Sequence, residues 1–480
     1  MTPTVVHFAP LDWAVLAGFV AAVLALGFSA RLRQSTMLQF LAAGRTLTLP
    51  VFVATLVSTW YGGILGVGES AATFGLGTWL LLGVPYYVFA LIYALYFAGR
   101  VRKNDQLSLP ERLELRWGRG VGLVGAGLVL LLAVPAAQVY MLGVLIQFFT
   151  GWAVLPSLLV GALVVTGFLL KGGLLADARV GMLAFVLMYV GFIAIDVYAV
   201  ARHPVAEIMP ALRAHNLLRV TGGVGWIGVI SFFMLGAWTL VDPAFHQRVT
   251  SSASPEVGRR GVFISILFWM LFDLLSLVAG LYAIALLKTQ PSDLVALYPV
   301  FGDAILPAGL KGLFFVGMAG TITSALAGYT LVSGATVGRE IVARLRRESN
   351  EARITAWSRG GLFVGAAVAV VVALQVHSVV EIWYGYSGAI VGALLLPVCF
   401  AYLDRPTKRI RPIAATLSMA ISFLVAAAWM IEAMRTKNPY MNVSWLGQTF
   451  SLGTLIPALV VSGAILGAAA LVGKPAAGEG

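Results

Sequence analysis

Residues 49–70 read LPVFVATLVSTWYGGILGVGES, and this stretch decides the fold. It is long and apolar enough to cross a bilayer, whose hydrocarbon core needs about 20 apolar residues. Two adjacent glycines, Gly62 and Gly63, lie near its middle, and glycine weakens a helix. Backbone groups freed by a helix break must line a cavity, because lipid cannot satisfy them. We therefore expect a broken membrane helix here, with close helix packing through glycine as the alternative.

Apolar runs of similar length recur along the whole chain. Of its 480 residues, 60% are hydrophobic and only 11% are charged, whereas soluble domains carry about 25% charged residues. The sequence predicts an all-α polytopic membrane protein with thirteen transmembrane spans. These spans are residues 11–30, 48–72, 76–99, 120–150, 152–171, 178–201, 222–243, 261–287, 309–337, 358–376, 379–402, 412–432 and 452–472.

The positions of the basic residues test this span count. With the N-terminus outside, 25 of the 32 Lys and Arg residues fall in predicted inside segments, as the positive-inside rule requires. The net charge of +12 is then explained by orientation and by contact with anionic lipid, and it does not indicate nucleic-acid binding. We expect an integral protein of a bacterial inner (plasma) membrane, with the C-terminus in the cytoplasm. The basic residues left outside are Arg202, Arg213, Arg219, Lys288, Lys311, Arg435 and Lys437.

The ninth span carries hydroxyl groups on one helix face. Gly317, Thr321, Ser324 and Gly328 share that face at a spacing of three and four residues. Small residues at this spacing commonly serve helix packing. Their hydroxyl oxygens also suit a hard cation such as sodium, so the pattern leaves both interpretations open.

Asp273 lies near the middle of the 261–287 span. A carboxylate at this depth costs roughly 2.5–3.5 kcal/mol on insertion scales. Such a residue either faces a cavity, where it relays ions or protons, or is hydrogen-bonded between helices. Asp242 and Arg248 flank an inside loop, and they are candidates for a structural latch.

The candidate solute contacts are polar, aromatic or glycine residues at membrane depth. Gln138 follows Pro135, which kinks a helix and frees a carbonyl group. Each of these residues could equally serve packing. No GxxxxGK[ST] run and no catalytic constellation is found in the sequence, so we expect neither an ATP-driven pump nor an enzyme. The candidates are Trp60, Tyr61, Gly62, Gly63, Gln138 and Tyr386.

Several segments together resemble the sodium:solute symporter family, which includes sodium-coupled sugar, proline and sialic acid transporters. The resemblance rests on their order and spacing and on the span count. In chain order the segments are FLAAGRTL (40–47), SLPERLELRWG (108–118), GGLLADARVGMLAFVLMYVGF (172–192), TLVDPAFHQRVTSSAS (239–254) and MAGTITSAL (318–326).

The resemblance implies sodium-coupled symport of a small polar organic solute by alternating access, within the lipid bilayer. It places the sodium ion against the backbone carbonyls of Leu56 and Thr59, and against hydroxyls at positions 320 and 321. It also implies two inverted five-helix repeats after one extra helix. The implied parts are residues 1–47 (extra helix), 48–201 (first repeat), 202–402 (second repeat) and 403–480 (two further helices).

This sequence departs from the family pattern at the implied ion site. Gly320 stands where the family usually has serine, Thr323 where many members have aspartate, and Gly181 where a carboxylate is usual. Thr321, Ser324 and two carbonyls would still form a weaker site. The alternatives are proton coupling through Asp273, uncoupled transport, or a sensor derived from a transporter.

Overall fold

The computed structural model describes residues 6–375, 378–403, 410–435, 441–445 and 448–472. Within them, twelve helices are long and apolar enough to cross a membrane. The predicted all-α membrane fold is therefore confirmed, and the chain is an integral membrane protein. Lys437, one of the basic residues placed outside, lies beyond the described residues.

The first half of the chain is almost entirely helical, with short 3-10 (η1, η2) or π-helical (η3, η4) turns between α-helices. Its elements are α1 (Pro10–Ser29), α2 (Met37–Ala42), η1 (Ala43–Arg45), α3 (Leu49–Trp60), η2 (Tyr61–Gly63), α4 (Ile64–Phe74), η3 (Trp79–Gly83), α5 (Val84–Ile92), η4 (Tyr93–Phe97), α6 (Ala98–Lys103), α7 (Leu109–Trp117), α8 (Arg119–Ala133), α9 (Ala136–Thr150) and α10 (Val154–Arg202).

The second half has the same character, with one antiparallel hairpin in the predicted 433–451 loop. Its elements are α11 (Val205–Ala214), α12 (Gly225–Leu235), η5 (Gly236–Leu240), α13 (Pro243–Thr250), α14 (Pro255–Leu286), η6 (Leu294–Ala296), α15 (Leu297–Ile305), α16 (Leu310–Ala335), η7 (Thr336–Ala343), α17 (Arg344–Arg346), α18 (Glu351–Ala373), α19 (Val379–Glu381), η8 (Ile382–Ser387), α20 (Gly388–Tyr402), α21 (Pro412–Arg435), β1 (Met441–Trp445), β2 (Gln448–Leu452) and α22 (Leu455–Val472).

The 49-residue element α10 contains two of the predicted spans, 152–171 and 178–201. It consists of two helices joined across a kink at Gly173, which has φ 50° and ψ −136°. A Cβ at this position would lie 2.3 Å from the carbonyl oxygen of Phe40, so only glycine fits. The described residues thus form twelve long apolar elements, not thirteen, and the count of thirteen crossings stays a prediction.

The predicted span 222–243 corresponds to the apolar span Gly228–Thr250, and the helix within it is interrupted. The 3-10 segment η5 follows α12, and α13 begins only at Pro243, after the N-cap residue Asp242. Proline favours a helix start because it has no N–H to donate. Gly236 allows close approach, since a Cβ there would lie 2.7 Å from Pro85. The first helix of each predicted repeat is therefore interrupted.

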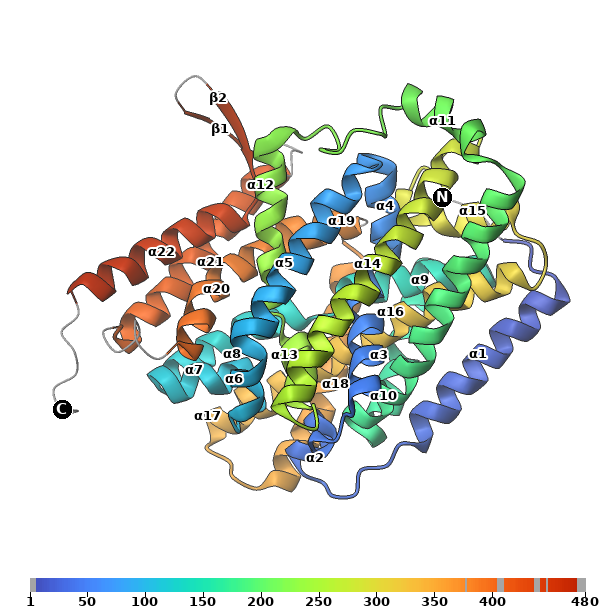
Figure 1. Cartoon of the computed structure of the whole chain (residues 1–480). Coiled ribbons are helices and arrows are strands. Elements are labelled where there is room, and N and C mark those ends of the chain that lie inside the picture. The colour runs from blue at the N-terminus through green and yellow to red at the C-terminus, as the bar shows by residue number, and fades with distance from the viewer. Residues whose placement is uncertain (1–5, 376–377, 404–409, 436–440, 446–447, 473–480) are drawn as a thin grey trace.

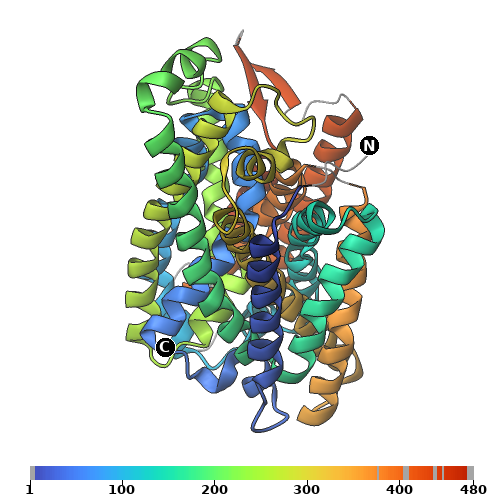
Figure 2. The same ribbon diagram turned by 90° about the vertical axis from the view of Figure 1, so that its right-hand side faces the viewer.

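The long helices run side by side between two faces of the molecule, with α1 at the periphery (Figures 1 and 2). Large apolar side chains cover the outward surfaces of these helices; Leu267 on α14 is 67% exposed and Val197 on α10 is 63% exposed. Such a surface would be unstable in water and suits the hydrocarbon region of a bilayer.

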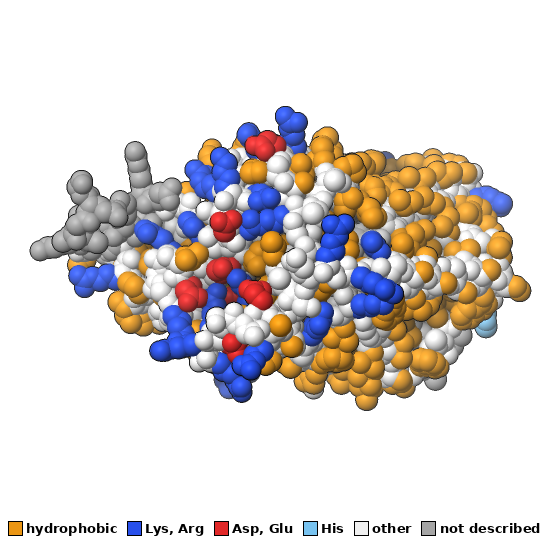
Figure 3. Space-filling model, turned by 90° about the horizontal axis from the view of Figure 1, so that it is seen from below, with side chains coloured by type: hydrophobic (Ala, Val, Ile, Leu, Met, Phe, Trp, Pro, Cys, Tyr) orange, Lys and Arg blue, Asp and Glu red, His pale blue; other side chains and the backbone are white. Residues whose placement is uncertain are grey.

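The connecting segments separate cleanly between the two faces. Helices α11 and α15 and the β-hairpin, from loops predicted to be outside, lie on one face in Figure 1. Helices α2, α7 and α17 lie on the opposite face, where Lys and Arg side chains gather together with Asp and Glu (Figure 3). This separation agrees with the predicted alternation of loops, and the cytoplasmic location of the basic face stays a prediction.

Cysteine labelling tests that orientation. In a Cys399→Ser background, cysteines placed at Ser254 and Ser292 should react with an impermeant maleimide from opposite sides of the membrane, with Ser292 outside. The reason is that these positions lie at opposite ends of α14 and its flanking loop. Labelling of both positions from the same side would contradict the topology.

Candidate functional site

The predicted interruption of the second span is present. The 3-10 turn Tyr61–Gly63 separates α3 from α4. A Cβ at Gly62 would lie 1.8 Å from the Cβ of Ala325 in α16, and one at Gly63 would lie 2.2 Å from the ring of Trp383. The broken helix and the close packing therefore occur together. The two glycines let Ala325 and Trp383 approach at the point where the helix is interrupted.

A cavity of about 1070 Å³, counted with its open part, lies beside this turn. Of the predicted solute contacts, Trp60, Tyr61, Gly63, Gln138 and Tyr386 line it. Gly62 does not, because its Cα faces α16. Eight of the 21 residues that line the cavity are aromatic. The rings that line it are Trp60, Tyr61, Tyr86, Tyr87, Trp238, Tyr329, Trp383 and Tyr386.

Trp60 is the last residue of α3, and its ring packs against neighbouring aromatic rings. The centroid of its ring lies 5.1 Å from that of Tyr86 and 5.1 Å from that of Trp269. Buried aromatic clusters of this kind hold their members in fixed orientations. The aromatic face that Trp60 offers to the cavity is therefore preorganised.

Asp273 on α14 lines the cavity, which agrees with the cavity-facing alternative. Its Oδ2 accepts a hydrogen bond from the Tyr87 hydroxyl. A Cβ at Gly83 would lie 2.9 Å from the same oxygen, so the glycine leaves room for the carboxylate. The Tyr87 hydroxyl thus holds the carboxylate at the wall of the cavity, and the Tyr61 hydroxyl also interacts with it.

Asp242 also lines the cavity, at the interruption of the other helix. Its Oδ1 accepts from the backbone N–H of Phe245 at 2.6 Å, and its Oδ2 accepts from the Tyr329 hydroxyl at 2.6 Å. Arg248 pairs with Asp177 and not with Asp242. The two candidate latch residues thus bind different helices, and Asp242 also serves as the N-cap of α13.

Oxygen atoms from α3 and α16 gather just behind the cavity. The hydroxyls of Ser58 and Ser324 are 3.0 Å apart, and Thr59 Oγ1 is 3.4 Å from Ser324 Oγ. The Thr321 hydroxyl donates to the carbonyl of Met318 at 2.9 Å, which leaves its lone pairs available. Ser58 was not among the predicted ion ligands, although it is adjacent to Thr59 in sequence.

The two glycines that replace usual ion ligands face this region or lie next to it. A Cβ at Gly181 would lie 3.2 Å from Ser324 Oγ and 3.3 Å from Ser58 Oγ, while one at Gly320 would face Ala184 of α10 at 3.3 Å. The hydroxyl cluster therefore borders α10 at a point where this chain supplies no side-chain oxygen. Hard cations prefer several oxygen ligands, so the residues present fit a weak sodium site.

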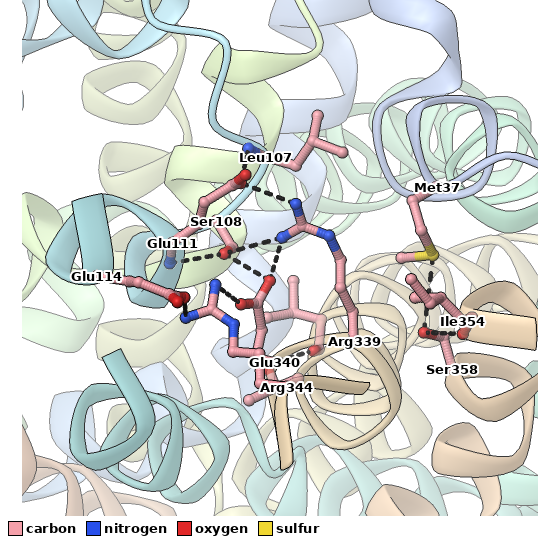
Figure 4. Close-up of polar contacts among 12 residues, drawn as sticks. Met37, Leu107, Ser108, Glu111, Glu114, Arg339, Glu340, Arg344, Ile354 and Ser358 are labelled. Atoms are coloured by element: carbon pink, nitrogen blue, oxygen red, sulfur yellow. Dashed lines mark hydrogen bonds and ion pairs between the residues drawn. The ribbon is translucent and has the colours of Figure 1, made fainter. Parts of the chain in front are cut away.

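Charged side chains join α7 to η7 and α17 on the basic face of the molecule (Figure 4). The buried carboxylate of Glu340 accepts from Ser108 at 2.7 Å and pairs with Arg339 and Arg344. Glu111 also pairs with Arg339, at 2.9 Å. These contacts tie the two predicted repeats together between the cavity and this face.

A second set of contacts joins α4 to α19, away from the basic face (Figure 1). Glu69 on α4 accepts a hydrogen bond from the Ser378 hydroxyl at 2.5 Å and from the backbone N–H groups of Val379 and Val380. This carboxylate caps the start of α19, close to Trp383. Glu69 belongs to the first predicted repeat and Ser378 to the second, so these contacts also join the two repeats.

Interrupted helices that meet at a central cavity are typical of secondary transporters. The chain belongs to the sodium:solute symporter family, whose sequence model matches residues 40–407. Its members are transporters and not enzymes, so both the resemblance and the expectation of a non-enzyme are confirmed.

Characterised relatives are distant. The high affinity choline transporter 1 of Homo sapiens is 23% identical over 374 residues, which cover 72% of this chain and 63% of the relative. The sodium/glucose cotransporter 4 of Danio rerio is 23% identical over 416 residues, covering 75% and 62%. The chain therefore spans less than two thirds of the length of these relatives.

Solved structures show the same fold at low identity. A substrate-bound, outward-open Na+-coupled sialic acid symporter superimposes with a TM-score of 0.80 at 13% identity, covering 98% of this chain and 99% of the other. A manganese transporter of Eremococcus coleocola gives a TM-score of 0.53 at 14% identity, with 92% and 95% covered.

Several lining residues were missed by the sequence analysis. Tyr86 and Tyr87 follow Pro85 in the third span, and Trp383 lies three residues before Tyr386. Adjacent aromatic residues beside a proline or glycine at membrane depth are the signal that was available. Glu69 was missed because an acidic residue near a span end is usually solvated.

Proposed function

We propose that the chain is a sodium-coupled symporter that carries a small organic cation inward by alternating access. One observation supports the choice of a cation. The cavity combines eight aromatic side chains with the carboxylates Asp242 and Asp273, and none of the described residues that line it is Lys or Arg. Aromatic faces attract ammonium groups, and carboxylates supply the opposite charge.

The names of two relatives support the same class of solute. Proteins of Homo sapiens and Drosophila melanogaster at 23% and 22% identity are named as high-affinity choline transporters, and choline is a quaternary ammonium ion. A sugar would leave the carboxylates without a charged partner, and an anionic solute would be repelled by them.

The proposed sodium ligands are the backbone carbonyls of Leu56 and Thr59 and the hydroxyls of Thr321 and Ser324, with Ser58 beside them. Because Gly320 and Gly181 supply no side-chain oxygen, sodium affinity should be weak. The inward sodium gradient would drive uptake while repeats 48–201 and 202–402 move relative to one another around the cavity.

Proton coupling is the alternative, and the position of Asp273 favours it. A carboxylate that lines the cavity beside tyrosine hydroxyls can exchange a proton with water inside the cavity. In that case a proton gradient would replace the sodium gradient as the driving force.

Uptake into proteoliposomes with imposed gradients tests the proposal. Labelled choline should enter faster with an inward sodium gradient than with potassium, and tetramethylammonium should compete whereas glucose and lactate should not. Removing the ligand hydroxyl in Thr321→Ala should raise the sodium concentration for half-maximal uptake about tenfold, while Thr321→Ser, which keeps the hydroxyl, should not.

Two outcomes would reject parts of this proposal. Uptake driven by a proton gradient in sodium-free buffer, and unchanged in Thr321→Ala, would reject sodium coupling. Competition by glucose or lactate without competition by any ammonium ion would reject the organic cation.

A further inference from the structure

A fully buried ion pair lies directly beside the proposed ion site. The side chains of Asp177 on α10 and Arg248 on α13 are both 0% exposed, and Arg248 Nη2 donates to Asp177 Oδ2 at 2.5 Å. The same nitrogen donates to Thr59 Oγ1 at 3.0 Å. The guanidinium therefore joins the carboxylate of α10 to a hydroxyl of α3 that also borders the cavity.

The guanidinium and the hydroxyl cluster share an oxygen atom. Thr59 Oγ1 lies between Arg248 Nη2 and Ser324 Oγ, at 3.0 Å and 3.4 Å. A Cβ at Gly328 on α16 would lie 3.1 Å from the same nitrogen, so glycine makes room for the guanidinium. Arg248 Nη2 is therefore one hydrogen bond away from a residue whose backbone carbonyl is a proposed sodium ligand.

Part of this ion pair has no hydrogen-bond partner among the described residues. Asp177 Oδ1 and Arg248 Nε and Nη1 are buried without one. Buried charged groups are costly unless their remaining atoms are satisfied. Asp177 Oδ1 thus remains available to a second cation, whereas the positive charge of Arg248 opposes one at short range.

We propose that Arg248 is a built-in competitor of the coupling ion and sets the sodium affinity of this transporter. Arg248 takes the negative charge of Asp177, which a sodium ion would otherwise use, and it also binds the side chain of Thr59, whose backbone carbonyl is a proposed sodium ligand. Asp177, one turn before Gly181 on α10, supplies the carboxylate that position 181 lacks. This inference deepens the sodium half of the proposed function and rests on it.

The two halves of the ion pair should therefore affect sodium binding in opposite directions. Arg248→Gln removes the competing charge and leaves Asp177 for sodium, so the sodium concentration at half-saturation should fall about tenfold. Asp177→Asn leaves the positive charge uncompensated, so that concentration should rise at least tenfold. The double variant should return close to the wild-type value. If the ion pair were purely structural, both single variants would change the sodium concentration at half-saturation in the same direction.

Sodium-dependent thermal unfolding of the purified full-length protein measures these values without transport. The unfolding temperature is recorded against NaCl, with KCl holding the ionic strength constant, because a ligand of the native state raises it by mass action. Lys311→Gln is the matched control, since the Lys311–Asp303 pair lies 2.6 Å apart outside the cavity; its half-saturation should match that of the wild type. Arg248→Lys keeps the charge and should show no gain in affinity.

The outcomes separate this inference from the proposed function. A sodium response in the wild type that does not strengthen in Arg248→Gln overturns the inference and leaves sodium coupling intact. If sodium raises the unfolding temperature only in Arg248→Gln, the inference is supported and sodium coupling in the wild type is overturned. If Arg248→Gln cannot be purified, Asp177→Asn decides the question, and unchanged half-saturation in that variant overturns the inference.

Discussion

Uptake by the Asp273→Asn variant should fall about 100-fold below that of the wild type. Asp273 lines the cavity, and its Oδ2 accepts a hydrogen bond from the Tyr87 hydroxyl. At an effective dielectric constant of about 20, an ammonium group roughly 5 Å from a carboxylate gains about 3 kcal/mol, which corresponds to about 100-fold in affinity. Initial rates of choline uptake, measured over a range of concentrations, give the comparison.

The matched control for this variant is Asp105→Asn. The Asp105 side chain is 97% exposed and pairs with Arg45 on the basic face, where an ion pair contributes little. Its uptake should match that of the wild type. Uptake by Asp273→Asn within a few-fold of the wild-type rate would contradict a charge contact between Asp273 and the solute.

Binding and exchange separate the two roles that Asp273 can have. If the carboxylate holds the solute, Asp273→Asn loses both binding and solute exchange across the membrane. If the carboxylate carries the coupling proton, the variant still binds and exchanges solute but no longer accumulates it, and wild-type uptake depends on the proton gradient.

The fold was readable from the sequence because lipid imposes a single strong constraint on helix length. The two predicted spans within α10 were separated in the sequence by Lys171 and Asp177, whereas the structure joins them across the kink at Gly173 without a loop between the helices. The interruption at η5 was missed. Six residues separate Gly236 from Pro243, and neither residue alone marks a break in an apolar run.

The site was only partly predictable, for a related reason. Trp60, Tyr61 and Gly63 were found because the break and the aromatic residues lie within one short stretch. Asp177 and Arg248 are 71 residues apart, and no local pattern indicates that they meet. The missing carboxylate at position 181 was visible by resemblance, whereas its relation to Asp177 depends on helix packing.

Replacing Gly62 by alanine should give the largest loss of stability among single substitutions at η2. The added Cβ would lie 1.8 Å from the Cβ of Ala325, so α3 and α16 must move apart. Overpacking of this kind costs about 1–3 kcal/mol or more, and we expect a lower unfolding temperature together with at least 100-fold slower uptake. Gly18→Ala on α1 is the control, because a Cβ there meets nothing within 4 Å.

A second substitution separates the two reasons for glycine at this position. In Gly62→Ala/Ala325→Gly the methyl group is moved across the interface, and the nearest remaining contact of the new Cβ is Ala325 Cα at 3.3 Å. If close packing is the reason for glycine, stability and uptake should largely recover in the double variant. If the interrupted helix itself requires glycine, alanine at position 62 stays harmful whatever faces it. If stability recovers and uptake does not, close packing at Gly62 is needed for the fold, and its conformational freedom is needed for transport.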